Sequence, residues 1–329
     1  MPTTLQDSVV VITGASSGIG RAAALDFARK GANVVLGARR EELLRAVATE
    51  CKQISGRDAV VVPTDVSDEA AVKRLGQQAF EHFGRIDVWV NNAGVGAFGR
   101  FEETPPEVFR QVIETNFFGT VYGARVALTY MRQQKSGVII NTSSLIGVVV
   151  GPYYSAYSAS KHAVRALGES LRQELEALDP DVNIHICTVL PATIDTPFFR
   201  HSANYTGRAV KALPPVYPPE QVAATIVGCA EHPKRQVFVG NAGRMISLTH
   251  NLAPIVGERM LAHQIDIGHF KPEFAPVTSG NTLQPMADGS DITDGWGGAP
   301  KTAVRGLLTL GTVAAAAGLL AWTWFRNQE

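Results

Sequence analysis

Residues 9–20 read VVVITGASSGIG, an apolar run of four residues that leads through Thr into a glycine-rich turn. A short Val/Ile run of this kind is typical of a strand buried in a parallel sheet. The glycines allow a tight turn and let the backbone approach a bound group closely. A helix that opens directly after the turn offers free N–H groups and the positive end of its dipole. This stretch therefore predicts a first strand, a phosphate-binding turn and a first helix.

Further short apolar runs follow along the chain, separated by segments of helical length. They are residues 34–36, 60–62, 86–90, 138–140, 184–190 and 237–239. Together with residues 9–12 they predict an α/β fold, a doubly wound parallel seven-stranded Rossmann-type sheet covered by helices on both faces. We expect one catalytic domain over residues 1–269, with its core at about 8–240 and a helical extension over 241–269. Thr104 and Glu107, with two prolines between them, predict a capping box at the start of one helix.

The composition of the 329 residues excludes several classes of protein. Lys plus Arg and Asp plus Glu both number 30, so the formal net charge is zero, which argues against binding nucleic acid through bulk positive charge. The three cysteines have no paired spacing, so we expect neither a disulfide framework nor a cysteine-rich metal site, and no metal.

The C-terminal region differs from this average. Residues 306–325 read GLLTLGTVAAAAGLLAWTWF, 20 residues without a charge. A helix of this length spans roughly 30 Å, the thickness of the hydrocarbon core of a bilayer. We expect a membrane anchor over 305–326 with the catalytic domain on the cytoplasmic side, preceded by a flexible linker over 270–304 rich in Pro, Gly, Ser and Asp. The alternative is a buried helix that folds back onto the domain. The N-terminus has no pattern of a secretory signal.

A second set of residues has the pattern of a catalytic site. Tyr157 and Lys161 stand at i and i+4 and so share one face of a helix. A nearby ammonium favours the phenolate and brings tyrosine into the range of a general base. Ser144 follows the apolar run at 138–140, and Asn116 stands in the preceding helical segment.

The order and spacing of Asn116, Ser144, Tyr157 and Lys161, with the G-x-x-x-G-x-G turn at residues 14–20, resemble the short-chain dehydrogenase/reductase family over about residues 8–240. The resemblance implies that Tyr157 exchanges the hydroxyl proton, Ser144 binds the substrate oxygen, and Lys161 binds the nicotinamide ribose and lowers the pKa of Tyr157. Asn116 would hold a water on the path to Lys161. Ser143 is an alternative to Ser144 if the strand end is shifted by one residue.

The same resemblance assigns the residues that bind the cofactor. They are Gly14, Ser16, Ser17, Gly18, Ile19, Gly20, Arg39, Arg40, Asp65, Val66, Asn92, Ala93, Gly94, Tyr157, Lys161, Pro191, Ile194 and Thr196. The chain departs from the family pattern at Ala192, where the family usually has glycine. A Cβ at that position could alter how closely the backbone approaches the nicotinamide.

The choice of cofactor depends on the residues after the second strand. An acidic residue there binds the ribose 2′-hydroxyl of NAD, whereas this sequence has Arg39 and Arg40. Guanidinium groups suit a 2′-phosphate, which favours NADP(H), with NAD(H) possible. A carboxylate of Glu41 that turned back to the ribose would reverse this preference, and the arginines could instead be a solvated start of a helix.

Aromatic residues are candidates for an apolar substrate pocket next to a lid at about residues 198–217. They are Phe98, Phe101, Tyr153, Tyr154, Phe198 and Phe199, and each could equally be core packing. The extension over 241–269 could pack on the domain, pair two subunits or lie on a membrane.

The sequence thus predicts a membrane-anchored, NADP(H)-dependent oxidoreductase that interconverts a carbonyl and an alcohol on a small, apolar substrate. The alternative is a membrane-tethered sensor or scaffold that binds NADP without catalysis. Such a sensor needs the glycine turn but not Asn116, Ser144, Tyr157 and Lys161. We expect no nucleic-acid partner, and a homo-oligomer is possible.

Overall fold

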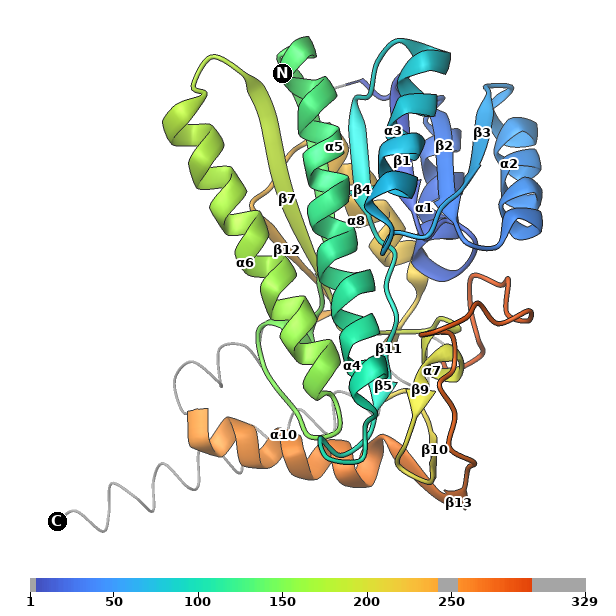
Figure 1. The fold of residues 1–329 in the computed structure, drawn as a ribbon, viewed down its shortest axis with the longest axis vertical. Helices are drawn as coiled ribbons and strands as arrows, with labels where there is room; N and C mark the ends of the chain where they lie inside the picture. The colour runs from blue at the N-terminus through green and yellow to red at the C-terminus, as the bar shows by residue number, and fades with distance from the viewer. Residues whose placement is uncertain (1–3, 242–253, 298–329) are drawn as a thin grey trace, which may run out of the picture.

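The computed structural model describes residues 4–241 and 254–297, and its centre is a seven-stranded parallel sheet. The strand order is β12-β7-β6-β4-β1-β2-β3 (Figure 1). The bounds are β1 Val9–Thr13, β2 Asn33–Ala38, β3 Ala59–Pro63, β4 Val88–Asn91, β6 Ser136–Thr142, β7 Asn183–Pro191 and β12 Gln236–Val239. Every apolar run identified in the sequence contributes to one of these strands, and the predicted fold class is confirmed. The order reverses between β1 and β4, the position at which such sheets bind their ligands.

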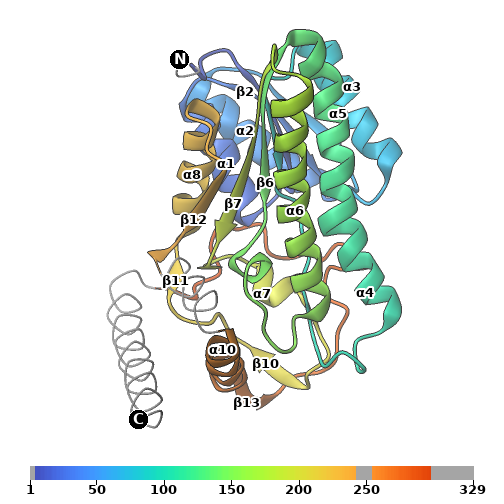
Figure 2. The same cartoon turned by 90° about the vertical axis from the view of Figure 1, so that its left-hand side faces the viewer.

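Helices cover both faces of the sheet, because successive side chains of each strand point to opposite sides. Val10 and Ile12 of β1 pack with α1, α2 and α8, while Val9 and Val11 pack with α3, α5 and α6 (Figure 2). The main helices are α1 Gly18–Arg29, α2 Glu41–Ser55, α3 Glu69–Phe83, α4 Pro106–Ile113, α5 Gly119–Gln134, α6 Ser155–Leu178 and α8 Pro219–Glu231. A strand buried on both faces explains why residues 9–12 are apolar without alternation.

The start of α4 differs from the predicted capping box. The helix begins at Pro106 with Pro105 as its N-cap, and the Thr104 hydroxyl donates to the carbonyl of Arg100 instead. Proline at the first helical position has no N–H to satisfy, so the helix needs one capping acceptor fewer. The capping-box prediction was therefore wrong by one residue, although the helix is present.

Smaller elements lie beyond the carboxyl ends of the strands. They are the β5–β9 pair (Ala97–Phe98 and Ala203–Asn204), the β8–β11 pair (Thr193–Ile194 and Val216–Tyr217), the β10–β13 pair (Arg208–Val210 and Phe270–Phe274), η1 Glu114–Phe118, η2 Leu145–Gly147, α7 Phe198–His201 and α10 Pro254–Gly268. Helix α10 packs on this layer: Asp266 accepts hydrogen bonds from Tyr153 and Arg208. The described part of the C-terminal extension therefore packs against its own domain.

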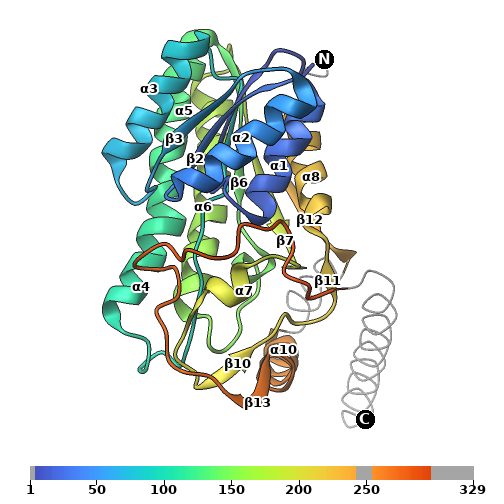
Figure 3. The ribbon, with the colours of Figure 1, turned by 90° about the vertical axis from the view of Figure 1, so that its right-hand side faces the viewer.

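The segment that follows β13 does not behave as the flexible linker expected over 270–304. Residues 275–297 cross the molecule below β2, β3 and α1 (Figure 3). Main-chain carbonyls of this segment accept hydrogen bonds from Arg21, Arg39 and Arg40. A segment rich in Pro, Gly, Ser and Asp is irregular whether it is free in solvent or bound to a neighbouring surface. The composition therefore could not distinguish a free linker from a segment that binds the domain through its backbone. We call residues 275–297 the strap.

The expected membrane anchor over 305–326 lies outside the described residues. Among the residues that are described, no helix has the length and apolar character needed to cross a bilayer.

Candidate active site

The glycine turn brings β1, α1 and β4 into close contact. A Cβ on Gly20 would lie 2.2 Å from the carbonyl oxygen of Gly14, and Gly14 itself has a φ of +68°. The Asn92 amide donates to the carbonyl of Thr13 over 3.1 Å, which joins the turn to the end of β4. Because these approaches exclude larger side chains, the pattern of glycines in the sequence follows directly from the packing.

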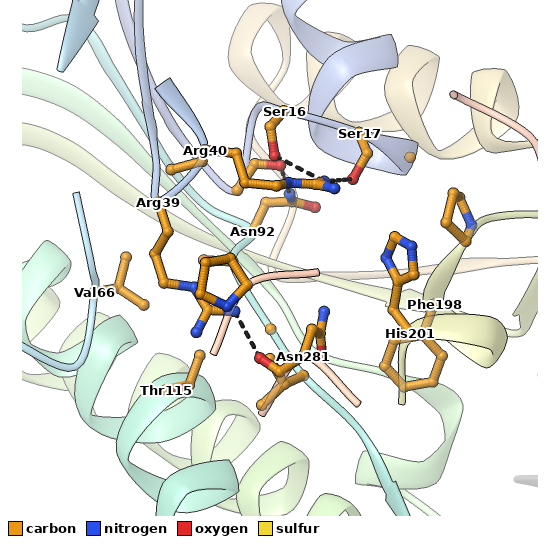
Figure 4. Close-up of a pocket in the computed structure, with 18 of the residues that line it drawn as sticks. Ser16, Ser17, Arg39, Arg40, Val66, Asn92, Thr115, Phe198, His201 and Asn281 are labelled. Atoms are coloured by element: carbon orange, nitrogen blue, oxygen red, sulfur yellow. Dashed lines mark hydrogen bonds between the residues drawn. The ribbon is translucent and has the colours of Figure 1, made fainter. Parts of the chain in front are cut away.

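A pocket extends from this turn along the carboxyl ends of β1, β2 and β4 (Figure 4). The predicted cofactor residues that line it are Gly14, Ser16, Ser17, Gly18, Ile19, Arg39, Arg40, Asp65, Val66, Asn92, Ala93, Gly94 and Thr196. Others line it that the sequence did not indicate, among them Thr115, His201, Asn281, Pro285 and Met286. The last three belong to the strap, and nothing in their residue types could have identified them.

Arg39 and Arg40 follow β2 and lie at one end of the pocket. The Arg40 Nη2 atom donates to the hydroxyls of Ser16 and Ser17, at 3.2 and 3.0 Å (Figure 4). Partial burial lowers the pKa of both arginines, although a guanidinium stays charged at any physiological pH. Two hydroxyls and two guanidinium groups form a site suited to an anion.

Glu41, the residue whose side chain could have reversed the choice of cofactor, points elsewhere. Its carboxylate accepts hydrogen bonds from Arg45, one turn further along α2. The Glu41 carboxylate is therefore not turned back toward the position of the ribose.

Three of the predicted catalytic residues lie on neighbouring elements: Ser144 is the N-cap of η2 after β6, and Tyr157 and Lys161 lie on α6. The Lys161 ammonium donates to the carbonyl of Thr142 over 2.8 Å, and its Nζ lies 5.7 Å from the centre of the Tyr157 ring. The hydroxyl of Ser143, the alternative to Ser144, donates to the main-chain carbonyl of Lys161 over 2.8 Å. Its proton is therefore used in holding the end of β6 to α6 and does not point to a substrate. Ser144 instead hydrogen-bonds the Tyr157 side chain, which lowers the pKa of that phenol, and its hydroxyl accepts from the Ile146 N–H at 3.3 Å.

Burial dominates the acid–base properties of the pair. Desolvation raises the pKa of Tyr157 to about 12, with the bond to Ser144 opposing it. Desolvation also lowers the pKa of Lys161 to about 8. The expected lowering of the Tyr157 pKa by Lys161 is therefore not seen here, because removal from water favours the neutral form of both groups.

Asn116 lies in η1, a short π-helix between α4 and α5. Its side chain accepts from the Val95 N–H at 2.8 Å and donates to the Val95 carbonyl and to the Ser160 hydroxyl. A Cβ on Gly94 would lie 3.3 Å from Asn116 Oδ1 and 3.5 Å from Lys161 Nζ. Asn116 therefore fixes the loop after β4 beside Lys161, a role that the sequence did not predict.

The segment after β7 is only partly in the pocket. Thr196 lines it, whereas the side chain of Ile194 is buried in the core and Pro191 ends β7. At the position where the family usually has glycine, the Ala192 N–H donates to the carbonyl of Val239 at 2.9 Å. The backbone of Ala192 thus continues the pairing of β7 with β12 by one bond, and its side chain is half-buried.

Aromatic side chains surround Tyr157. Phe198 and Tyr154 have ring centres 5.2 and 6.3 Å from the Tyr157 ring, and Tyr154 bonds through its hydroxyl to the buried His269. Phe98, Tyr153, Phe199 and Phe270 complete this aromatic cluster. Phe101 is 70% exposed and packs on Phe109 instead. Five of the six aromatic residues suggested by the sequence are thus together, and His269 and Phe270 were missed.

Comparison with known proteins agrees with this geometry. The short chain dehydrogenase family matches residues 8–205. The chain belongs to the short-chain dehydrogenase/reductase family. This short-chain dehydrogenase is 39% identical over 259 residues to the uncharacterized oxidoreductase YxnA of Bacillus subtilis, covering 78% of the chain and 72% of the relative. It is 34% identical over 262 residues to the 3-ketodihydrosphingosine reductase of Bos taurus, covering 77% and 78% of the two chains.

Solved structures show the same fold. The alcohol dehydrogenase of Thermococcus sibiricus, complexed with 5-hydroxy-NADP, superposes with a TM-score of 0.61 at 30% identity, covering 71% of this chain and 96% of that one. A short chain dehydrogenase/reductase from Burkholderia phymatum in complex with NAD gives 0.69 at 26% identity, covering 78% and 97%. The protein is therefore an oxidoreductase that binds NAD(P) and acts on a small molecule.

Proposed function

We propose that this short-chain dehydrogenase uses NADP(H) to interconvert an apolar ketone or aldehyde and its alcohol. The observation that carries the proposal is the aromatic cluster around Tyr157, since a carbonyl compound whose oxygen reaches that phenol has its apolar part beside these rings. The non-catalytic sensor is disfavoured, since a sensor has no use for a buried tyrosine, lysine and serine held together.

The preference for NADP(H) is supported by the end of β2. Arg39, Arg40, Ser16 and Ser17 supply cationic and hydroxyl donors for a 2′-phosphate, and Glu41 is bound to Arg45. A charge-assisted hydrogen bond is roughly twice as strong as a neutral one, so these donors favour a phosphate over a ribose hydroxyl.

The chain's own residues act on the proton and the substrate oxygen. The Tyr157 hydroxyl donates its proton to the carbonyl oxygen in reduction and takes it back in oxidation. The Ser144 hydroxyl hydrogen-bonds the same oxygen and stabilises its developing charge. Lys161 stabilises the phenolate that reduction leaves behind. The nicotinamide supplies the hydride when it is bound.

The substrate class is a long-chain or polycyclic carbonyl compound. One relative of similar length is named a 3-ketodihydrosphingosine reductase, and the chain is 41% identical over 185 residues to an 11-beta-hydroxysteroid dehydrogenase-like protein of Arabidopsis thaliana, covering 56% of this chain and 46% of that one. Both names describe large apolar substrates, in agreement with an aromatic cluster.

Purified protein with a panel of carbonyl compounds tests the proposal. Oxidation of NADPH is followed with a long-chain 3-ketone, a steroid ketone, a fatty aldehyde and a sugar, and then with NADH at equal concentration. We expect turnover with the apolar compounds, none with the sugar, and a preference for NADPH of about tenfold or more. A clear preference for NADH, or for the sugar, would contradict it.

Attachment to a membrane is a separate proposal and is supported by the uncharged run at residues 306–325. After cell fractionation and washing with alkaline carbonate, the full chain should stay in the membrane pellet, and a chain ending at residue 304 should appear in the supernatant. Release of both would refute the anchor.

A further inference from the structure

The strap occupies the donors that the cofactor's phosphates require. The backbone N–H of Gly18, at the start of α1, donates to the carbonyl of Asp291 over 3.0 Å. Arg39 Nη2 donates to the carbonyl of Asn281 over 2.7 Å (Figure 4). Arg40 Nη1 donates to the carbonyl of Asp288 over 2.8 Å, with the carbonyls of Met286 and Gly289 each at 3.3 Å.

Both terminal nitrogens of Arg40 already have hydrogen-bond acceptors. Each terminal nitrogen of a guanidinium carries two N–H groups. Those of Nη1 face strap carbonyls and those of Nη2 face Ser16 and Ser17. A phosphate that binds Arg40 through Nη1 must therefore replace strap carbonyls.

Further contacts hold the strap from Asp288 to Trp296. Arg21 donates to the carbonyl of Ser290 over 2.9 Å. The Asp195 carboxylate accepts from the backbone N–H groups of Asp294 and Trp296, at 3.0 and 2.9 Å. Arg200 forms ion pairs with Asp288 and Asp294. The pocket beneath measures about 190 Å³, below the roughly 300–1,000 Å³ of ordinary small-molecule sites.

We propose that the strap competes with the phosphates of the cofactor for Gly18, Arg39 and Arg40, so that a bound 2′-phosphate displaces the strap from the two arginines. A 2′-phosphate forms charge-assisted bonds to the two arginines and displaces neutral carbonyls, whereas the ribose hydroxyl of NAD does not. The Asp288 carboxylate beside Arg40 adds repulsion between the strap and the phosphate. The strap thus lowers the affinity for NADP(H) more than the affinity for NAD(H), and the inference rests on the proposed use of NADP(H).

Hydrogen–deuterium exchange on the full chain tests the competition. Peptides covering residues 281–291 are followed with no ligand, with NADP⁺ and with NAD⁺, each at matched occupancy established by calorimetry. With NADP⁺ we expect amides of residues 281–291 to exchange about tenfold faster or more, and with NAD⁺ we expect residues 281–289 to stay as protected as in the free protein.

The outcomes separate the two proposals. If calorimetry shows no binding of NADP⁺, the proposed function fails. If NADP⁺ binds and exchange in residues 281–291 is unchanged or slower, the strap is a fixed wall of the site and the competition is overturned.

Two glycines of the strap provide matched variants. A Cβ on Gly289 would lie 2.2 Å from Nε2 of His201, whereas a Cβ on Gly295 meets no atom within 4 Å. Both residues have left-handed backbone, with φ of +74° and +76°, so Gly289→Ala and Gly295→Ala introduce similar backbone strain. Of the two variants, we expect Gly289→Ala also to push the strap away from His201, which lines the pocket.

We expect Gly289→Ala to bind NADP⁺ about three- to tenfold more tightly, because less of the protein is in the strapped state. It should gain less for NAD⁺, which leaves the strap on the two arginines, and Gly295→Ala should change either affinity less than twofold. An unchanged or weakened NADP⁺ affinity in Gly289→Ala, with strap exchange accelerated, would overturn the proposal. If hydrogen exchange of the strap amides is the same in Gly289→Ala and the wild type, the variant has not loosened the strap. The exchange of the wild type with NADP⁺ and with NAD⁺ then decides whether the strap competes with the cofactor.

Discussion

The two ends of the cofactor site are stabilised in different ways. At the catalytic end, Lys161 bonds to Thr142 and Asn116 bonds to Val95, so the partners come from neighbouring elements of the sheet domain. At the phosphate end, Arg39 and Arg40 bond to carbonyls more than 240 positions later in the chain. The difference indicates that the catalytic end is fixed by the fold itself, while the phosphate end depends on a segment that binds from outside it.

The largest expected effect comes from breaking the catalytic end alone. Tyr157→Phe removes the hydroxyl that exchanges the proton and leaves the ring in the aromatic cluster. We expect kcat for carbonyl reduction to fall about 10³-fold, within the range of general acid catalysis. Calorimetry should show NADP⁺ affinity within twofold of the wild type. A loss of affinity equal to the loss of kcat would show that the two ends are not independent.

The second prediction concerns the charge of Lys161 in the protein without cofactor. Its folded pKa of about 8 lies below the ordinary lysine value of 10.5, so between pH 8 and 10 the unfolded chain binds more protons than the folded one. Stability from this group therefore rises with pH over that window, by about 2 kcal/mol, and is lowest below pH 8. Tyr157 acts in the opposite direction only above pH 10, since its pKa is raised to about 12.

Denaturant unfolding of wild type and Lys161→Met at pH 8, 9 and 10 measures this. The difference in stability, wild type minus variant, should become more positive with pH. A constant difference would mean that the lysine is not desolvated as the geometry indicates.

The strands and the glycine turn could be predicted from the sequence because residue type determines them. Residues 9–12 must be apolar to be buried on both faces, and Gly20 must lack a Cβ to approach Gly14. The strap could not be predicted, since its contacts to Arg39 and Arg40 use main-chain carbonyls that every residue has. The pKa of Tyr157 was expected to fall and is raised, because spacing shows that Lys161 is near but not how far both groups are removed from water.

A weaker effect is expected from removing a cation at the phosphate end. Arg39→Ala removes one cation from the proposed 2′-phosphate site and one bond to the strap. We expect the Kd for NADP⁺ to rise about tenfold, as for the loss of a charge-assisted bond, with NAD⁺ affinity and kcat at saturating NADPH within twofold. Equal losses for both cofactors would place Arg39 outside the 2′-phosphate site.

The smallest effect concerns the apolar surface at the catalytic end. Phe199 belongs to the aromatic cluster, whereas Phe101 is 70% exposed. Phe199→Ala should raise the KM for a long-chain ketone about fivefold, since contact between an apolar chain and the ring is lost, and Phe101→Ala should leave it unchanged. Because Phe199 also packs on Trp296 of the strap at 6.0 Å between ring centres, the Kd for NADP⁺ is measured on both variants. An increase in the KM for the ketone with an unchanged Kd for NADP⁺ would show that the aromatic cluster contacts the substrate. A change in Kd alone would instead assign Phe199 to the strap, and equal KM values for the two variants would remove the aromatic cluster as the argument for an apolar substrate.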